Sequence, residues 1–167
     1  MTKPKYQQSN QDSNEKLIER LRTLTHLLDN AIPIPGTPYR IGLDPLLGLI
    51  PGGGDIAGAA LSAYIVISAA KFGLPRESLL RMVLNILLEF VVGTVPVLGD
   101  LFDVAWKANV KNMELLDTHI KSPHMGKKAD MWFVFLLVGG LMLVVIGAIA
   151  FGITLITLLF GLLTGNG

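Results

Sequence analysis

The stretch from Met131 to Leu163 decides the fold class, and it reads MWFVFLLVGGLMLVVIGAIAFGITLITLLFGLL. It contains neither a charged residue nor a proline. A helix of about 20 apolar residues is enough to cross the hydrocarbon core of a bilayer, so this stretch suffices on its own. Because lipid offers the backbone no hydrogen-bond partner, a membrane also selects helix here. We therefore predict a C-terminal transmembrane segment over residues 131–163.

The length of this segment leaves two arrangements to weigh. As one helix it would extend about 50 Å, which is more than a hydrocarbon core of about 30 Å requires. A helical hairpin would need its turn near Val145 to Ile149, where the sequence has no Asn, Asp or Pro. An apolar turn would leave carbonyl groups without partners. We therefore expect one long helix, tilted or protruding, with the hairpin as the alternative.

Small residues recur every seven positions along the same segment, at Gly140, Gly147, Thr154 and Gly161. Small residues at a heptad spacing let another helix approach closely with left-handed packing. The seam fits self-association into a homo-oligomer, or contact with another membrane protein. It fits packing on the core of the same chain equally well, and the sequence does not separate these readings.

The rest of the chain holds all the charge. Charged residues make up 16% of the sequence and apolar residues 51%, whereas a soluble domain has about 25% charged residues. Every Lys and Arg lies at or before Lys128, and every acid at or before Asp130. The positive-inside rule then places the N-terminus and a basic linker at 118–130 in the cytoplasm, with the C-terminal end opposite. We expect an integral protein of a cytoplasmic-type membrane.

The N-terminal part divides into three segments. Residues 1–14 are rich in Gln, Asn and Ser, so we expect disorder and no cleavable signal peptide. Residues 15–30 place Leu17, Leu21, Leu24 and Leu28 on one face, which predicts an amphipathic helix. Packing on a partner helix is favoured over the membrane surface. Three prolines between residues 33 and 38 then indicate a rigid turn.

An internal repeat follows the proline-rich turn. DPLLGLIPGGGD at residues 44–55 and EFVVGTVPVLGD at residues 89–100 share the pattern acid-x3-Gly-x-(Ile/Val)-Pro-x2-Gly-Asp, offset by 45 residues. Each copy predicts a helix, a Pro-Gly interruption and a second helix that begins at an Asp N-cap. The expected helices are 41–50 and 56–71 in the first copy, and 79–95 and 101–117 in the second. The two repeats, at about 40–72 and 79–117, form a membrane-embedded core over residues 31–117.

Polar residues gather near both interruptions. We predict an intramembrane polar network of Arg40, Asp44, Asp55, Arg81, Asn85, Glu89, Asp100 and Asp103. Acids at broken helices bind ions in transporters. Ion pairs from Arg40 to Asp44 and from Arg81 to Glu89, together with the Asp N-caps, are the favoured interpretation. Gly54, Gly58 and Ser62 have the spacing of a close helix contact, most simply within the chain.

These motifs resemble a membrane family known as domain of unknown function 4112. The resemblance rests on IPGT at residues 34–37, Tyr39-Arg40, GLDPLLGLIPG at 42–52, Gly54-Asp55, and Pro96 with Gly99-Asp100 and Asp103. It covers roughly residues 24–116, and the apolar C-terminal segment looks like an addition to that shared core. The resemblance implies no established activity, cofactor or catalytic residue.

Several function classes find no support in the sequence. The glycine-rich stretch 51–55 lacks the Gly-Lys-Ser/Thr ending of a phosphate-binding loop. The chain has no cysteine, and His26, His119 and His124 have no partner ligand at metal spacing. A net charge of +1 without a basic cluster does not indicate nucleic-acid binding. We expect no catalysis, no cofactor and no metal site.

Two functions remain as hypotheses for this all-α membrane protein, which has two broken-helix units and a long C-terminal transmembrane helix. The first is a structural, assembly or interaction module whose partners are the bilayer and a second membrane-protein chain. The alternative is a small ion or solute transporter or channel that uses the acids at the broken helices.

Overall fold

The computed structural model describes residues 5–43, 53–93, 106–122 and 128–164, and these residues are mostly helical. The elements are α1 (Lys5–Asn30), β1 (Ile32–Pro33), β2 (Arg40–Ile41), α3 (Gly53–Lys71), α4 (Arg76–Gly93), α6 (Ala108–Lys121) and α7 (Met131–Thr164). The prediction of one long C-terminal helix is confirmed, because α7 runs without a break. The alternative hairpin is therefore wrong.

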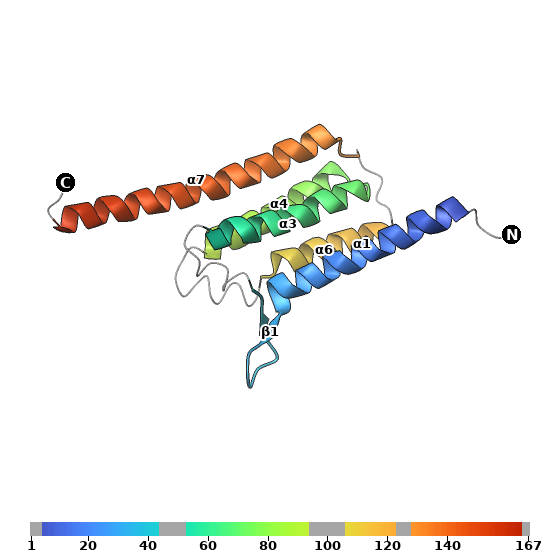
Figure 1. Ribbon diagram of the computed structural model, residues 1–167, viewed down its shortest axis with the longest axis horizontal. Coiled ribbons are helices and arrows are strands. Elements are labelled where there is room, and N and C mark those ends of the chain that lie inside the picture. The colour runs from blue at the N-terminus through green and yellow to red at the C-terminus, as the bar shows by residue number, and fades with distance from the viewer. Residues whose placement is uncertain (1–4, 44–52, 94–105, 123–127, 165–167) are drawn as a thin grey trace.

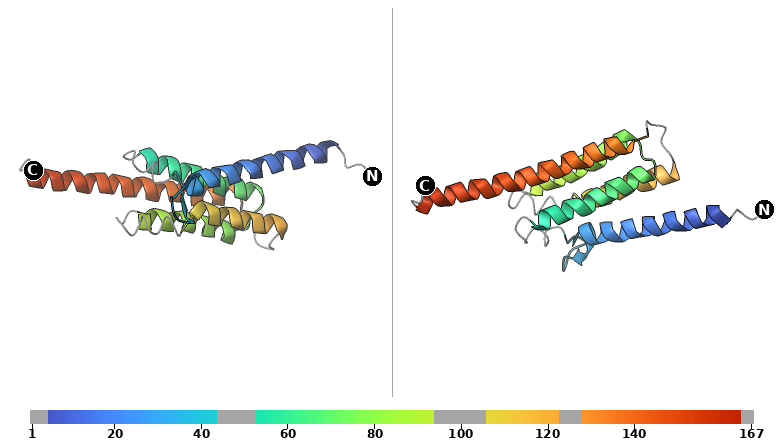
Figure 2. Two further views of the ribbon diagram at one scale, coloured as in Figure 1. Left: turned by 90° about the horizontal axis from the view of Figure 1, so that it is seen from below. Right: turned by 45° about the horizontal axis from the view of Figure 1, so that its top comes forward.

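The helices run in roughly the same direction and pack in three layers (Figures 1 and 2). α3 and α4 form the middle layer, α7 packs on one side of this pair, and α6 with α1 packs on the other. Two helices extend beyond this body. The C-terminal half of α7 projects from one end, and the N-terminal half of α1 projects from the opposite end (Figure 1).

One apolar core joins the layers. Each helix contributes fully buried side chains to it: Leu21 from α1, Ile65 from α3, Leu79 from α4, Leu116 from α6 and Val134 from α7. The predicted leucine stripe of α1 lies on this core, with Leu21 and Leu28 buried and Leu17 and Leu24 partly buried. Because α3 is apolar on nearly every side, it can occupy the middle of the stack.

The connection between α3 and α4 is a tight reversal set by Gly73. Gly73 has a φ of 83°, in the left-handed range that favours glycine. The N–H of Leu74 donates to the carbonyl of Ala69 at 3.3 Å, and the N–H of Gly73 donates to Ala70 at 2.9 Å. This pair of bonds is the Schellman motif, which satisfies the last carbonyls of a helix. Leu74 is then fully buried, so the turn is fixed to the core.

A short hairpin follows the C-terminal end of α1. β1 pairs antiparallel with β2, with Ile32 opposite Ile41 and Pro33 opposite Arg40. Next to it, a Cβ added to Gly42 would lie 1.3 Å from the carbonyl oxygen of Leu28. Only glycine allows the chain to pass this close to α1. The Pro-rich segment therefore folds back onto α1 as a hairpin.

The start of α7 is tied to the start of α4. The N–H of Phe133 donates to the Asp130 carboxylate at 2.7 Å, which caps α7. Asp130 also pairs with Arg76, and the Arg76 guanidinium lies 5.0 Å from the centre of the Phe133 ring. The capping bond and the Arg76 pair hold the pKa of Asp130 below its usual value.

Several predicted boundaries are wrong. α1 begins at Lys5, so residues 5–14 are helical rather than disordered. Lys and Gln extend an existing helix at little cost, even where Gln11 to Asn14 stay exposed. Arg40 and Ile41 are in a strand, not at the start of a helix over 41–50. The linker begins later than predicted, because α6 continues to Lys121.

The second copy of the repeat also differs from its prediction. The helix expected over 101–117 begins at Ala108. Trp106 and Lys107 are not helical, although their equivalents in the first copy, Leu61 and Ser62, lie within α3. In the first copy, α3 begins at Gly53, so Asp55 lies in its first turn and the predicted N-cap there is wrong. Pro51, Gly52 and the whole second interruption lie outside the described residues.

Leu141→Ala should destabilise the body by about 2–5 kcal/mol, because its side chain is 1% exposed and its loss leaves a cavity. Leu143→Ala is the matched control, since Leu143 is 73% exposed on the same helix. We expect the control to stay within about 0.5 kcal/mol of the parent. Denaturant unfolding in one detergent, followed by tryptophan fluorescence, measures both. Equal losses would show that the first half of α7 is not packed on α3 and α4.

Candidate functional site

A polar cluster surrounds the N-terminus of α6. The Asp29 side chain, from the end of α1, is 5% exposed. Its two oxygens accept hydrogen bonds from the Asn109 amide and the Val110 N–H, each at 2.8 Å. The Glu89 carboxylate, from α4, accepts from the Ala108 N–H at 3.0 Å. Two neighbouring helices thus supply the caps that α6 lacks, because the Lys107 side chain makes no capping bond.

Lys107 connects this cluster to the hairpin. Its ammonium donates to the Asn30 side-chain oxygen and to the Arg40 carbonyl, the latter at 2.8 Å. The Arg40 Nε donates to the Asn30 carbonyl at 2.8 Å. Lys107 therefore holds the end of α1, the strand β2 and the start of α6 together.

Burial controls the electrostatics of the cluster. Loss of water raises the pKa of Asp29 above its ordinary value, although hydrogen bonds from Asn109 and Val110 and the charge of Lys107 oppose this. Loss of water also lowers the pKa of Lys107, while Asp29 acts in the opposite direction. A carboxylate held this way stabilises the partial positive charge at a helix N-terminus.

A second polar contact lies about one turn further along α6. The Asn85 amide donates to the Asn112 side-chain oxygen at 2.9 Å, and the Asn112 amide donates to the Met82 carbonyl at 3.1 Å. Asn112 is fully buried. These bonds satisfy polar groups between α4 and α6, and they fix the register of the two helices.

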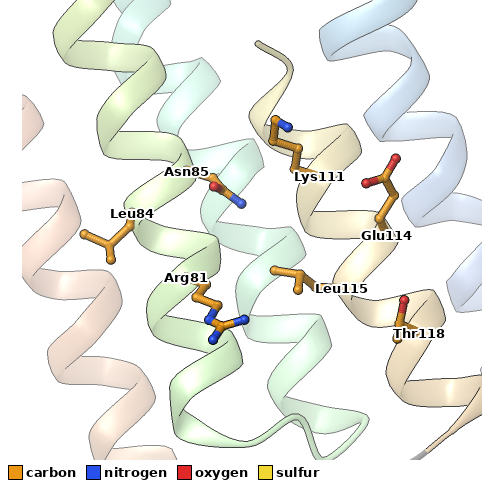
Figure 3. Close-up of a pocket in the computed structure, with 7 residues that line it drawn as sticks. All are labelled: Arg81, Leu84, Asn85, Lys111, Glu114, Leu115 and Thr118. Carbon is orange, nitrogen blue, oxygen red and sulfur yellow. The ribbon is translucent and has the colours of Figure 1, made fainter.

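Beside the amide pair, an open groove lies between α4 and α6 at the surface (Figure 3). Arg81 and Asn85 line it from α4, and Lys111 and Glu114 line it from α6. The groove therefore carries charged side chains.

The structure brings together part of the predicted network. Arg40 and Glu89 lie around the start of α6, and Asn85 lies one turn away. Arg81 and Glu89 are eight residues apart on α4, which is about 12 Å along the axis, so Arg81 faces the groove instead. Asp44, Asp100, Asp103 and the side chain of Asp55 lie outside the described residues.

The predicted packing residues separate into two groups. In α3, Ser62 is buried and Gly58 is partly buried, whereas the surroundings of Gly54 are not described. In α7, Gly140, Gly147 and Thr154 are exposed and Gly161 is partly exposed. A Cβ added to Gly140 or Gly147 would meet no atom within 4 Å. Within the part of the chain that the structure describes, these two glycines do not pack on the core.

Sequence reasoning missed Asp29, Asn109 and Asn112. Asn109 and Asn112 are three residues apart and fully buried on an otherwise mixed helix, which is a weak signal of an inward polar stripe. Asp29 lies near the end of the helix predicted over residues 15–30, and nothing nearby in sequence marks a partner 80 residues away.

The described residues include no group of three or more His, Asp or Glu that could hold a metal ion. The carboxylates of the cluster accept backbone and amide hydrogen bonds, so they act as caps. The polar cluster fixes the positions of α1, α4 and α6, and a groove with charged side chains lies beside it, between α4 and α6.

Comparison with known proteins identifies the family. The profile of the domain of unknown function (DUF4112) matches residues 17–120. The chain therefore belongs to this family, and α7 lies beyond the matched region. Neither the search of curated proteins nor the search of solved structures found a match.

Asp29→Asn should change how stability depends on pH. Because the folded-state pKa of Asp29 is raised, the folded chain binds more protons than the unfolded chain above about pH 4. The free energy of unfolding of the parent should then fall as pH rises through the raised pKa. The variant lacks this contribution, so its decrease should be smaller.

Unfolding of both proteins between pH 4 and pH 7 measures the difference, with Asp12→Asn, an exposed acid of the same helix, as the control. Parallel curves for the parent and Asp29→Asn would contradict the burial effect.

Proposed function

We propose that this DUF4112 protein is a small integral membrane protein that acts as a structural, assembly or interaction module without catalysis. The observation that carries the proposal is the free half of α7. From Ile146 to Thr164 no residue is buried, and the side chains are almost all apolar. These 19 residues extend about 29 Å as a helix, which matches a hydrocarbon core of about 30 Å.

The division of α7 favours a membrane span over a core helix. Its buried residues, Val134, Leu141 and Val145, all lie in the first half. Phe151, Ile156 and Phe160 in the second half are each at least 67% exposed. A monomer in water rarely exposes a contiguous apolar surface this large. Lipid is the partner whose chemistry matches this surface.

The basic residues support the proposed orientation. Lys71 ends α3, Arg76 begins α4, Lys121 ends α6 and Lys128 precedes α7. The C-terminal ends of α3 and α6 and the N-terminal ends of α4 and α7 lie at the end of the body opposite to the free half of α7 (Figure 1). The positive-inside rule then favours this end of the body on the cytoplasmic side, with the C-terminal end of the chain across the membrane.

We also propose that the two Pro-Gly stretches are broken-helix interruptions that meet the membrane surface. α3 and α6 begin, and α4 ends, at the end of the body from which the free half of α7 projects (Figure 1). Gly53 and Gly93, which flank the two stretches in sequence, are the described ends of α3 and α4. The sequences of both stretches are rich in apolar residues, which supports this proposal.

Transport is the alternative, and the described acids give it less support. Glu89 accepts a hydrogen bond from the α6 backbone, and Asp29 accepts two. Acids that cap a helix have a structural role, which favours the module.

Ile153→Lys combined with Ile156→Lys should remove membrane insertion. Both side chains are exposed near the middle of the free half, so the body is unaffected, while each Lys costs about 2.5–3.5 kcal/mol at the centre of a span. The full chain is mixed with phosphatidylcholine vesicles and floated on a density gradient. The parent should float, and so should the control with Leu at both positions. A lysine variant that floats equally well, or a parent that stays dispersed in buffer, would contradict the proposal.

Gly147→Leu tests assembly through the seam. Gly147 and Gly152 both face open space in the monomer, but only Gly147 lies on the heptad seam. If two copies pack there, Leu at 147 should convert the oligomer to monomer, and Gly152→Leu should leave it intact. The mass of the detergent-solubilised protein measures this. A parent that is monomeric would contradict self-assembly through the seam.

A further inference from the structure

The groove between α4 and α6 has both apolar and charged side chains along its walls. Its volume is about 480 Å³, and it is lined by Arg81, Leu84, Asn85, Lys111, Glu114, Leu115 and Thr118. Figure 3 shows the Arg81 guanidinium at one end and the Lys111 ammonium at the other, both on the side where the two helices face each other. With Glu114 as the acid among the lining residues, cations outnumber acids two to one.

Lys111 is held in position by an aromatic ring. Its ammonium lies 4.3 Å from the centre of the Trp106 ring, and the Trp106 indole N–H donates to the Asn85 carbonyl at 3.4 Å. The cation–π contact fixes the charge at the end of the groove that lies nearest the start of α6. Tryptophan and lysine side by side are typical of the interface between a membrane and water.

An apolar path leads away from the groove along α4. Leu84, at the rim, is 52% exposed, and Leu88, one turn further, is 40% exposed. The direction from Leu84 to Leu88 is toward the C-terminal end of α4. The free half of α7 projects from that same end of the body (Figure 1). An anionic headgroup in the groove could therefore be continuous with a hydrocarbon chain that reaches the bilayer.

We propose that this groove binds the headgroup of an acidic phospholipid. The phosphate binds at Arg81, whose planar guanidinium matches two phosphate oxygens, and Lys111 adds a point charge at the other end of the groove. The acyl chain follows Leu84 and Leu88 toward the membrane. This inference rests on the proposed membrane anchorage through α7, and it adds the class of lipid that the body recognises.

Titration of the full chain with short-chain phosphatidylglycerol in uncharged detergent tests the proposal. The chain has two tryptophans, so Trp132→Phe, at a 72% exposed position, leaves Trp106 as the fluorescent reporter. Arg81→Gln and Lys111→Gln should each weaken binding about fivefold, since a basic residue near a lipid surface contributes on the order of 1 kcal/mol. Leu88→Gln should also weaken it. Arg81→Lys should lose less affinity than Arg81→Gln, because it keeps the charge but not the paired contact. Arg20→Gln, at an exposed arginine of α1, is the matched control.

Two comparisons separate the sources of the anion. Phosphatidylcholine should bind more weakly than phosphatidylglycerol, and inorganic phosphate should not displace the lipid at millimolar concentration. Equal binding of both lipids, displacement by free phosphate, or no effect of Arg81→Gln would overturn the proposal. Flotation of Arg81→Gln with phosphatidylcholine vesicles, as in the parent, shows that anchorage by α7 is intact. Failure of the groove and failure of the anchor are therefore distinguishable.

Discussion

The apolar surface of α7 must be shielded from water. Among the described residues, its first half is shielded by the other helices and its second half is not, and this difference orients the rest of the structure. In the first half, Val134, Leu141 and Val145 are buried against α3 and α4. Removing such side chains from water contributes about 25 cal/mol per Å² of apolar surface, so this half becomes part of the core. The second half finds no such cover within the described chain. On the proposed function, lipid covers it, and the body then has a defined end that faces the membrane.

Polar contacts complement this apolar packing at the same end of the body. The first N–H groups of a helix lack partners within the helix, and leaving them unpaired in a buried place costs free energy. Asp29 and Glu89 accept from these groups at α6, and Lys107 joins the hairpin to the same point. These contacts join α1, α4 and α6. The surface groove between α4 and α6 lies beside the capped N-terminus of α6. The hydrogen bond between the Asn85 and Asn112 side chains fixes the register of α4 and α6, the two helices that form the groove.

Some elements could be predicted because their signals are local. The lack of charge after Asp130 predicts one helix, and the leucine spacing of Leu17, Leu21 and Leu24 predicts the buried face of α1. Glu89 accepts a hydrogen bond at the start of α6, whereas its predicted partner Arg81 lies about 12 Å away along the helix. The start of α6 could not be predicted, since carboxylates from two other helices set it.

Three properties can be read from the chain without its structure: it is mostly helical, its C-terminal helix is long and apolar enough to cross a bilayer, and it belongs to the DUF4112 family. These properties depend on composition and on spacing over a few turns. The three-dimensional packing was needed to learn which half of α7 is packed, where α6 begins, and that Arg81 and Lys111 line one groove. Each of these depends on contacts between residues far apart in the chain, whose geometry is set by how the helices pack and not by any local pattern.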